Sequence, residues 1–473
     1  MPVPVITIAQ MREWERATWA AGQTEAEVIR RVGKCVARRA ARFTRPGDPI
    51  LILAGKGHNG EDARAAREYL ADRRVEVLDL TETGTAGPKL DAAVALRPAL
   101  MIDGLFGIGL NRALSPEWAK LIQRVNESGL PVLAVDVPSG LNADTGEPQG
   151  AAIQAAVTLA VGAPKVGLVQ EAAAPFVGRL EVAADVGLVA CPHAGELQWT
   201  LPEDFVGYPP ARLAATHKGN YGHLAIVAGS LGYHGAAVLA ARGALRAQPG
   251  LITLHTLEAV YHAVAPQLQE VMVVAWQPGA KLAGAQDAIL FGPGLAADDL
   301  PDAMKLQVRH LWRDALVPVI ADASALDWLP LDPVPRNAVR VITPHPGEAA
   351  RLLRTTPQQV QADRLKALRN ISPRFGNTWV VLKGHQTLIG RSVGDVYVNA
   401  SGNPHLAQGG SGDVLAGYLA GLLVQPNLRA DVLKTIRYAV WQHGAAADSL
   451  QASRRNWIVK DLVEALGAQE PGG

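Results

Sequence analysis

The stretch Pro49-Ile-Leu-Ile-Leu-Ala54 and the segment Gly55-Lys-Gly-His-Asn-Gly-Glu-Asp62 that follows it decide the fold of the first half of the chain. An uninterrupted apolar run of this length is typical of a strand that is buried on both faces of a parallel sheet. The glycines allow a tight turn after the strand, and a helical pattern continues through Leu70. The order strand, glycine loop and helix therefore predicts an α/β fold with a doubly wound parallel sheet.

The same alternation of apolar runs and helix-length segments extends through most of the 473 residues. Predicted strands lie at 75–80, 99–103, 131–136, 157–161, 223–228, 251–256, 288–291, 317–321, 339–343 and 378–383, and helical patterns at 10–43 and 236–247. Turn residues without periodicity fill residues 190–215, which marks a domain boundary. We therefore predict a Rossmann-like domain at residues 1–204 and a larger α/β domain at residues 205–473.

Composition limits the classes of function. The 45 Lys and Arg residues nearly balance the 44 Asp and Glu residues, and the formal net charge of +1 argues against a nucleic-acid partner. The only two cysteines, Cys35 and Cys191, are too few for a disulfide framework or a metal cluster, as expected in a reducing compartment. The sequence shows no signal-peptide pattern and no apolar run of about 18 residues that would span a membrane. We expect a cytoplasmic protein without a membrane partner.

Several strand ends in the first domain carry polar side chains. Asn59 lies in the first glycine loop, Asp103 begins Asp103-Gly-Leu-Phe-Gly-Ile-Gly109, and Ser139 belongs to Asp136-Val-Pro-Ser-Gly-Leu-Asn-Ala-Asp-Thr-Gly146. Because parallel strands end at the same edge of a sheet, these side chains should meet in one crevice. Their oxygens suit a hard cation, and Asp136 beside them is a candidate acid or base.

Two other interpretations of the first domain stay open from these residues alone. Residues 55–60 fit the Gly-x-Gly-x-x-Gly pattern, and Asp79 ends the next predicted strand, as in a dinucleotide-binding dehydrogenase. That interpretation gives no role to Asp136-Val-Pro-Ser-Gly140. Each loop can also be a simple turn, since Asp and Gly favour turns, and the domain would then be a binding or scaffold module.

The chemistry of the second domain centres on Asn403-Pro-His-Leu-Ala-Gln-Gly-Gly-Ser-Gly-Asp413, which runs into an apolar helical pattern. Glycines before a helix leave backbone N–H groups and the positive end of the helix dipole free for an anion. Asp413 in the first turn either caps the helix or acts as a general base beside a phosphate. Elsewhere, Val381-Leu-Lys-Gly-His-Gln-Thr387 offers a lysine and a hydroxyl suited to phosphate, and Thr343-Pro-His-Pro-Gly-Glu348 presents His345 rigidly at a strand end.

Three motifs of the first domain resemble the NAD(P)H-hydrate epimerase family, the YjeF N-terminal domain. They are Gly-Lys-Gly-x-Asn-Gly-x-Asp at 55–62, Asp-Gly-Leu-Phe-Gly-x-Gly-Leu at 103–110 and Val-Asp-Val-Pro-Ser-Gly-Leu-Asn-Ala-Asp-Thr-Gly at 135–146. The resemblance implies that Asn59, Asp103 and Ser139 hold a K⁺ ion. It implies that Asp136 is the catalytic acid/base and that Lys165 supports it. The implied binding residues for the hydrated nucleotide are His58, Asn59, Gly60, Glu61, Asp62, Gly107, Ile108, Gly109, Leu110, Asn111, Arg112, Ala113 and Asp136.

The second domain resembles the ADP-dependent NAD(P)H-hydrate dehydratases, the YjeF C-terminal domain within the ribokinase-like superfamily. Six ordered motifs carry the resemblance, at 217–222, 235–246, 292–295, 343–348, 383–387 and 409–413. They imply a ribokinase-like α/β fold in which Asp413 is the catalytic base. The residues that would contact the hydrate are Ala236, Gly294, His345 and Asp413, and those that would hold the adenine nucleotide are Lys383, Gly384, His385, Gln386, Thr387, Gly409, Gly410, Ser411 and Gly412.

Together the two resemblances imply an enzyme that repairs nicotinamide nucleotides. The first domain would epimerise R and S NADHX and NADPHX, and the second would dehydrate the S form to NAD(P)H with release of AMP and phosphate. ADP would be the co-substrate, with Mg²⁺ for the nucleotide and K⁺ for the epimerase, and we expect a homo-oligomer. The alternative is a ribokinase-like kinase for a vitamin or a sugar, because that superfamily shares the base and the anion site.

The sequence departs from both families at identifiable positions. His58 and Glu61-Asp62-Ala63 stand where the epimerases usually have a second Asn and a glycine-rich run, which removes conformational freedom from that loop. Gly-Ser-Gly-Asp at 410–413 replaces the common Gly-Thr-Gly-Asp and keeps the hydroxyl. Ser324 replaces an acid of the dehydratases, although Asp322 remains. The departures bring the loop geometry of the epimerase into question more than the proposed base of the dehydratase.

Overall fold

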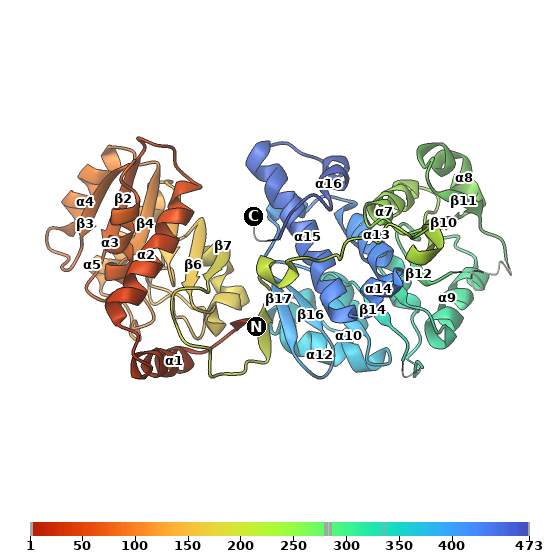
Figure 1. Ribbon diagram of the computed structural model, residues 1–473, viewed down its shortest axis with the longest axis horizontal. Helices are drawn as coiled ribbons and strands as arrows, with labels where there is room; N and C mark the ends of the chain where they lie inside the picture. Colours follow the sequence, from red (N-terminus) through yellow and green to blue (C-terminus); the bar gives the residue numbers. More distant parts are fainter. Residues whose placement is uncertain (1–2, 279–281, 283–285, 332, 336, 472–473) are drawn as a thin grey trace. The chain divides into compact units, whose positions relative to one another are not determined.

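A computed structural model describes residues 3–278, 282, 286–331, 333–335 and 337–471 (Figure 1). The chain divides into two compact units, an N-terminal unit at Val3–Trp199 and a C-terminal unit that begins at Thr200. The predicted boundary between residues 204 and 205 lies a short way inside the C-terminal unit. There Phe205 packs edge-on against Tyr438, and Asp204 pairs with Arg437, which ties the segment after residue 200 to the second core.

The N-terminal unit is built around a parallel sheet with the strand order β3-β2-β4-β5-β6-β7. Its strands are β2 (Pro49–Ala54), β3 (Arg74–Asp79), β4 (Leu100–Gly104), β5 (Val132–Val135), β6 (Val157–Val161) and β7 (Arg179–Ala183), and a short antiparallel pair is formed by β1 (Val3–Pro4) and β8 (Leu197–Trp199). In the register, Leu53 faces Asp103 and Asp103 faces Ala134. The loops after β2, β4 and β5 therefore leave the sheet at one edge.

Helices cover both faces of this sheet. They are α1 (Ile8–Ala20), α2 (Glu25–Ala41), α3 (His58–Ala65), α4 (Ala86–Ala95), α5 (Pro116–Glu127) and α6 (Ala174–Val177). Successive strand residues point to opposite faces, so Ile50 and Ile52 pack with α2 and α3 while Leu51 and Leu53 pack with α4 and α5. The continuous apolar run at 49–54 thus serves two cores, which confirms the doubly buried strand predicted from it.

The C-terminal unit contains a larger mixed sheet, ordered β17-β16-β15-β14-β13-β12-β9-β10-β11. Its strands are β9 (His223–Val227), β10 (Leu251–Thr256), β11 (Met272–Ala275), β12 (Ala288–Phe291), β13 (Val319–Ala321), β14 (Arg340–Ile342), β15 (Trp379–Leu382), β16 (Thr387–Gly390) and β17 (Val396–Asn399). Its helices are α7 (His234–Arg246), α8 (Glu258–Val264), α9 (Asp302–Asp314), α10 (Pro346–Leu353), α11 (Pro357–Ala362), α12 (Arg364–Arg374), α13 (Ser411–Leu423), α14 (Pro426–Arg429), α15 (Val432–Ser453) and α16 (Val459–Ala465).

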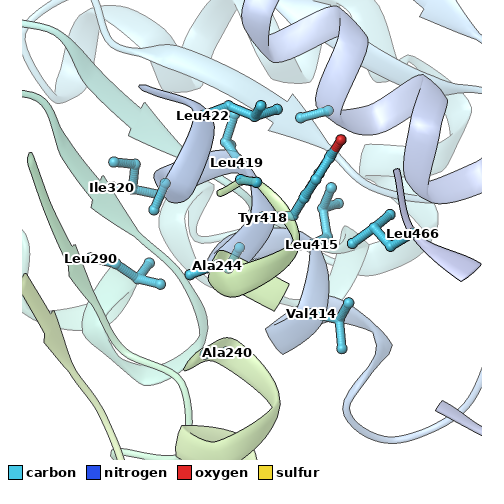
Figure 2. Packing of buried hydrophobic residues seen from close by; sticks show 14 of the residues in the cluster. Ala240, Ala244, Leu290, Ile320, Val414, Leu415, Tyr418, Leu419, Leu422 and Leu466 are labelled. Atoms are coloured by element: carbon cyan, nitrogen blue, oxygen red, sulfur yellow. The ribbon is translucent and has the colours of Figure 1, made fainter. Parts of the chain in front are cut away.

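Helix α13 lies at the centre of this unit and packs closely on α7. Figure 2 shows the buried cluster around α13, to which Ala240 and Ala244 of α7 belong. Small residues allow the two backbones to approach, because a Cβ on Gly417 would lie 1.9 Å from the Ala240 carbonyl oxygen. A Cβ on Gly243 would likewise lie 2.3 Å from the Val414 carbonyl oxygen. This fit fixes the N-terminus of α13, where the sequence predicts an anion site.

The sequence predicted the parallel strands but missed several others. Strands β16 and β17 form an antiparallel hairpin beside β15, and β7 and β11 lie at sheet edges. In β11 the side chains of Met272 and Val274 are exposed although the strand is apolar throughout, so its sequence carries no inside–outside alternation. Among the described residues, none of the helices combines the length and the apolar character needed to cross a bilayer.

Candidate functional sites

Part of the first glycine motif, residues 58–62, lies in helix α3, so some of its side chains face the protein core and others face solvent. The predicted loop at 55–62 is shorter than expected, because α3 already begins at His58. Asn59 and Asp62, three residues apart, are buried, whereas His58 and Glu61 are exposed. His58 Nε2 lies 2.5 Å from Glu25 Oε1 at the start of α2, so the departure from the family sequence at position 58 has a local ion-pair partner.

A cavity of about 810 Å³ lies at the sheet edge of the N-terminal unit. Of the residues predicted to bind the hydrate, those that line it are His58, Asn59, Asp62, Gly107, Ile108, Gly109, Leu110, Asn111, Arg112 and Asp136. Gly60, Glu61 and Ala113 are not part of this lining. Gly60 instead packs against β2, because a Cβ there would lie 2.2 Å from the Gly55 carbonyl oxygen. The lining also includes Arg12 and Glu15 of α1, which the sequence did not single out.

The three predicted cation ligands lie in one hydrogen-bonded group. Ser139 donates from its backbone N–H to Asp103 Oδ2 at 2.8 Å and from its hydroxyl to Asp103 Oδ1 at 2.6 Å. Asn59 Nδ2 donates to the Phe106 carbonyl at 2.9 Å, and Ser139 Oγ lies 3.2 Å from the same carbonyl. Asn59 Oδ1 is buried and has no hydrogen-bond partner within the described part of the chain. Burial raises the pKa of Asp103 to about 6, although the hydrogen bonds from Ser139 and Leu105 lower it. A cation here would supply a partner for Asn59 Oδ1 and a counter-charge for the Asp103 carboxylate.

Asp136 and Lys165 form a buried ion pair beside this group. The Lys165 ammonium donates to Asp136 Oδ1 and to the Val161 carbonyl at 3.1 Å, and it is fully buried. The Val161 N–H donates to the same Asp136 oxygen at 2.9 Å. Asp136 has φ +63°, a left-handed conformation that is uncommon outside glycine and turns its carboxylate toward these partners. The carboxylate predicted as the acid/base is therefore rigidly held at the cavity wall.

Asp79, the residue required by a dinucleotide-binding dehydrogenase, is engaged elsewhere. Arg64 of α3 donates to Asp79 Oδ1 at 2.8 Å, and Asp79 is not part of the cavity lining. The dehydrogenase interpretation needs this carboxylate free to meet a ribose. Because Asp79 pairs with Arg64, it does not support the dehydrogenase interpretation.

In the C-terminal unit, the stretch at 403–413 ends in the first turn of α13. Gly410 is the N-cap residue, with φ +98°, and no side chain caps this helix. Asp413 is the third helical residue, and its carboxylate makes no hydrogen bond or ion pair in the part of the chain that the structure describes. The Ser411 hydroxyl donates to the Leu406 carbonyl at 2.7 Å and so braces the loop. The capping alternative for Asp413 is therefore not supported.

Three further charged groups surround Asp413. Lys383, at the end of β15, lies 3.1 Å from Asp322 Oδ1 and 4.0 Å from Glu348 Oε2. Burial raises the pKa of Asp413 to about 7, and repulsion from Asp322 and Glu348 adds to this while Lys383 opposes it. Burial alone would lower the pKa of Lys383, but Asp322, Glu348 and Asp413 raise it. The site thus holds an ammonium that stays charged beside a carboxylate that takes up protons near neutrality.

Lys383 also faces the glycine turn of α13. A Cβ on Gly412 would lie 3.3 Å from Lys383 Nζ, so this ammonium stands next to the helix N-terminus. The positive helix end and the lysine together suit a phosphate. The sequence had assigned these two groups to separate nucleotide-binding segments, and the structure brings them together.

Three other residues of this unit, His345, Ala236 and Gly294, are predicted to contact the hydrate. His345 is the N-cap of α10, and its Nδ1 accepts a hydrogen bond from the Gly347 N–H at 3.0 Å. Glu348 Oε2 accepts from the His345 N–H at 2.8 Å, which completes a capping box. Ala236 and Gly294 adjoin each other, since a Cβ on Gly294 would lie 2.9 Å from Ala236 Cβ. Their contact with substrate stays a prediction.

Arg364 supports the predicted nucleotide loop at 383–387. Its guanidinium donates to the carbonyls of Leu382 at 3.0 Å and Gln386 at 3.1 Å, and also to that of His385. Gly384, at φ +140°, lies on the same side of the loop as these carbonyls, because a Cβ there would lie 3.2 Å from Arg364 Nη2. Arg364 begins α12, and no motif in the sequence connects it to the loop.

His443 was also missed by the sequence. It lies buried in α15, and its Nε2 is 3.0 Å from the Ser411 carbonyl at the start of α13. Burial lowers the pKa of His443 to about 4, so the ring is neutral at pH 7 and donates a hydrogen bond to that carbonyl. It thereby orients the first turn that carries Asp413.

Comparison with known proteins assigns both units. The family model for NAD(P)H-hydrate dehydratase matches residues 224–467, and that for the YjeF-related protein N-terminus matches residues 79–167. The bifunctional NAD(P)H-hydrate repair enzyme Nnr of Gloeobacter violaceus is 38% identical over an alignment of 505 residues, gaps included. The alignment covers 98% of this chain and 96% of that protein.

Solved structures resemble the C-terminal unit. The ADP/ATP-dependent NAD(P)H-hydrate dehydratase from Bacillus subtilis, co-crystallised with ATP and Mg²⁺, is 33% identical with a TM-score of 0.50, covering 55% of this chain and 92% of that one. A ribokinase-like superfamily protein from Enterococcus faecalis, 24% identical, has a TM-score of 0.52 over 59% of this chain and 97% of its own, which shows the shared fold. The chain belongs to the family of bifunctional NAD(P)H-hydrate repair enzymes, and its C-terminal unit has the ribokinase-like fold.

Proposed function

We propose that the chain repairs hydrated nicotinamide nucleotides with two active sites. The N-terminal unit interconverts the R and S forms of NADHX and NADPHX, and the C-terminal unit dehydrates the S form with an adenine nucleotide as co-substrate. The main observation in favour of the dehydratase is the position of Asp413. Its carboxylate lies in the first turn of α13, near the Lys383 ammonium, and makes no hydrogen bond to the described residues. This is a base placed next to an anion site.

The proposed dehydration converts a poor leaving group into a good one. Asp413 takes the proton of the C6 hydroxyl while the hydroxyl oxygen attacks the β-phosphorus of ADP, and AMP leaves. The phosphate then departs from C6 and a proton leaves C5, which restores the dihydropyridine ring. NAD(P)H, AMP and phosphate are the products.

Residues around Asp413 take defined parts in this scheme. Lys383 and the N–H groups of Gly409–Gly412 hold the transferred phosphate, and the loop at 384–387 holds the rest of the nucleotide. Ala236, Gly294 and His345 contact the hydrate. The neutral His443 keeps the first turn of α13 in position through the Ser411 carbonyl.

Mg²⁺ fits the same site by the chemistry of its donors. The Asp322 and Glu348 carboxylates lie beside Lys383 and offer the oxygen ligands that Mg²⁺ prefers together with nucleotide phosphates. Bound there, the ion would neutralise phosphate charge. The Bacillus subtilis relative, co-crystallised with ATP and Mg²⁺, supports a nucleotide and Mg²⁺ here.

The epimerase site is assigned to the cavity at the N-terminal sheet edge. Asp136, paired with Lys165, handles the proton at the C6 oxygen of the hydrate. The unpartnered Asn59 Oδ1, the Asp103 carboxylate and the Ser139 hydroxyl fit K⁺, which would hold the glycine loop in place. We further infer a cytoplasmic location, in keeping with the two free cysteines, and the homo-oligomer stays a prediction.

One experiment tests both activities. Full-length protein is incubated with mixed R and S NADHX and either ADP or ATP, and recovery of the dihydronicotinamide absorbance is followed. Complete recovery is expected, since the epimerase feeds the dehydratase. Recovery that stops with the R form unused contradicts the epimerase, and a stable phosphorylated product without NADH identifies a kinase instead.

A further inference from the structure

Glu15 brings a second carboxyl to the epimerase cavity that no motif accounts for. Helix α1 forms one wall of the cavity through Met11, Arg12 and Glu15. Met11 and Trp14 are buried in a small apolar cluster that anchors this helix, so Glu15 is held at a fixed place. Its carboxyl makes no hydrogen bond or ion pair within residues 3–199, all of which the structure describes. A half-buried carboxyl that lines the cavity without a hydrogen bond or an ion pair is available to a bound ligand.

The electrostatic surroundings of Glu15 favour its protonated form. Burial raises its pKa, and the negative charge of Asp136 raises it further, against smaller opposing effects of Lys165, His58 and Arg12. Asp136, in contrast, has the Lys165 ammonium as a hydrogen-bond partner. In this cavity Asp136 therefore has a cation as a hydrogen-bond partner, whereas Glu15 has none among residues 3–199.

Inversion at C6 of the hydrate needs proton transfer in two directions. The hydroxyl that leaves C6 must receive a proton, and the water that adds to the other face must lose one. A single rigid carboxyl cannot stand on both faces of the ring. Two carboxyls on different walls of one cavity meet this requirement, and Asp136 follows β5 whereas Glu15 lies on α1.

We propose that Glu15 is the proton donor of the epimerase and that Asp136 is its partner on the opposite face of the ring. This inference rests on the proposed epimerase function. Glu15 gives its proton to the C6 hydroxyl, the C6–O bond breaks, and the N1 lone pair forms an iminium as water leaves. Water then adds to C6 from the other face and passes a proton to Asp136. The net change is inversion, with the two carboxyls exchanging protonation states, and the reverse reaction uses them in the opposite order.

Asp62 is the third carboxyl in this cavity. It lies on the same buried face of α3 as Asn59, next to the candidate cation site. Burial raises the pKa of Asp62 well above its usual range, and repulsion from Asp136, Glu61 and Glu15 adds to this. The resemblance to the epimerases makes Asp62 a predicted binding residue for the hydrate, and that role stays a prediction.

Variants of the full chain test the assignment, with R-NADHX as substrate and the dehydratase unit reporting on the S form produced. Glu15→Gln keeps the shape but cannot donate a proton, so we expect the rate constant of epimerisation to fall at least about 100-fold with little change in KM. Glu15→Asp should retain part of the rate. Glu13→Gln is the matched control, since Glu13 lies on the same helix, is exposed and does not line the cavity.

The pH profile separates proton donation from a structural role, and isotope labelling tests the C6–O cleavage step. The wild-type rate should decline at alkaline pH as the donor loses its proton, and Glu15→Gln should lack that decline. Inversion in H₂¹⁸O should place ¹⁸O on C6 of the S product. Dehydration of S-NADHX by each variant monitors the fold of the other unit.

The outcomes test the role of Glu15 separately from the proposed epimerase function. If the wild-type chain does not convert R-NADHX, the proposed epimerase is wrong. If the wild-type chain converts it and Glu15→Gln does so equally fast, only the role of Glu15 is wrong. An S product that retains ¹⁶O rules out the C6–O cleavage step.

Discussion

Replacing Asp413 with asparagine should abolish dehydration and at the same time stabilise the C-terminal unit. The amide cannot accept the proton of the C6 hydroxyl, so turnover should stop while the nucleotide still binds to Lys383 and the glycine turn. In the wild-type enzyme the carboxylate must be ionised, and its pKa is raised to about 7. The kcat/KM of dehydration should therefore increase about tenfold between pH 6 and pH 8, since kcat/KM reports the pKa of the free enzyme.

The stabilisation follows from the same raised pKa. The pKa of Asp413 is about 7 in the folded protein and 3.8 ordinarily, and this difference corresponds to about 4 kcal/mol at about 1.36 kcal/mol per pH unit. Because the folded pKa is the higher one, folding favours the protonated acid. The cost of ionising it is absent below pH 3.8, grows as the pH rises, and is complete above pH 7. Asparagine has no charge and avoids this cost.

Thermal unfolding at pH 4 and pH 8 measures the effect. At pH 8 the variant should unfold about 10 °C above the wild type for a unit of this size, and at pH 4 the two should nearly coincide. Asp299→Asn is the control, because Asp299 is exposed on a loop and should change neither stability nor rate. A stability difference that does not depend on pH, or a variant less stable at pH 8, would refute the reasoning. So would dehydration of S-NADHX at the wild-type rate.

Three other substitutions test separate parts of the structure. Lys383→Met removes the ammonium that opposes the raised pKa of Asp413, so the pH–rate profile of dehydration should move to higher pH and KM for the nucleotide should rise at least about tenfold. Asn59→Ala removes the buried oxygen that has no partner, so epimerisation should lose its response to added K⁺ while dehydration of S-NADHX continues; an unchanged K⁺ response excludes Asn59 as a ligand. Gly417→Ala would place a methyl 1.9 Å from the Ala240 carbonyl oxygen and force α7 from α13, which should lower the free energy of unfolding by about 1–3 kcal/mol in denaturant titrations; unchanged stability means that the helices are not tightly packed.

Much of the fold could be predicted because parallel strands carry a strong local signal. The run at 49–54 is apolar at every position, and the structure uses both of its faces. The strands that were missed, β16 and β17 among them, are short. β16 takes its place by pairing with β15, and β17 by pairing with β16, rather than from their own sequence patterns. The start of α3 was misjudged for a related reason. Gly57 and Gly60 indicate a loop, but Gly57 is the N-cap of α3 and Gly60 lies inside the helix, which packs against β2 and β4.

Some of the site residues could be predicted from the sequence and others could not, for the same reason. Asn59, Asp103 and Ser139 could be grouped from sequence because each follows a strand of one parallel sheet, and strand ends share an edge. Glu15, Arg364 and His443 could not, because each lies on a helix whose position depends on tertiary packing. Their neighbours in the site are distant in sequence and leave no pattern in the residues around them.

The two active sites use a lysine in different ways, and the difference matches the chemistry proposed for each. In the N-terminal unit, Lys165 donates directly to Asp136, so the ammonium and the acid/base form one buried pair. In the C-terminal unit, Lys383 donates to Asp322 instead, and Asp413 has no hydrogen-bond partner among the residues that the structure describes. Phosphoryl transfer needs an ammonium that can turn to a phosphate and a base that keeps a high affinity for protons. An Asp413 paired with Lys383 as Asp136 is with Lys165 would satisfy neither need, so Asp322 is what keeps the two groups available.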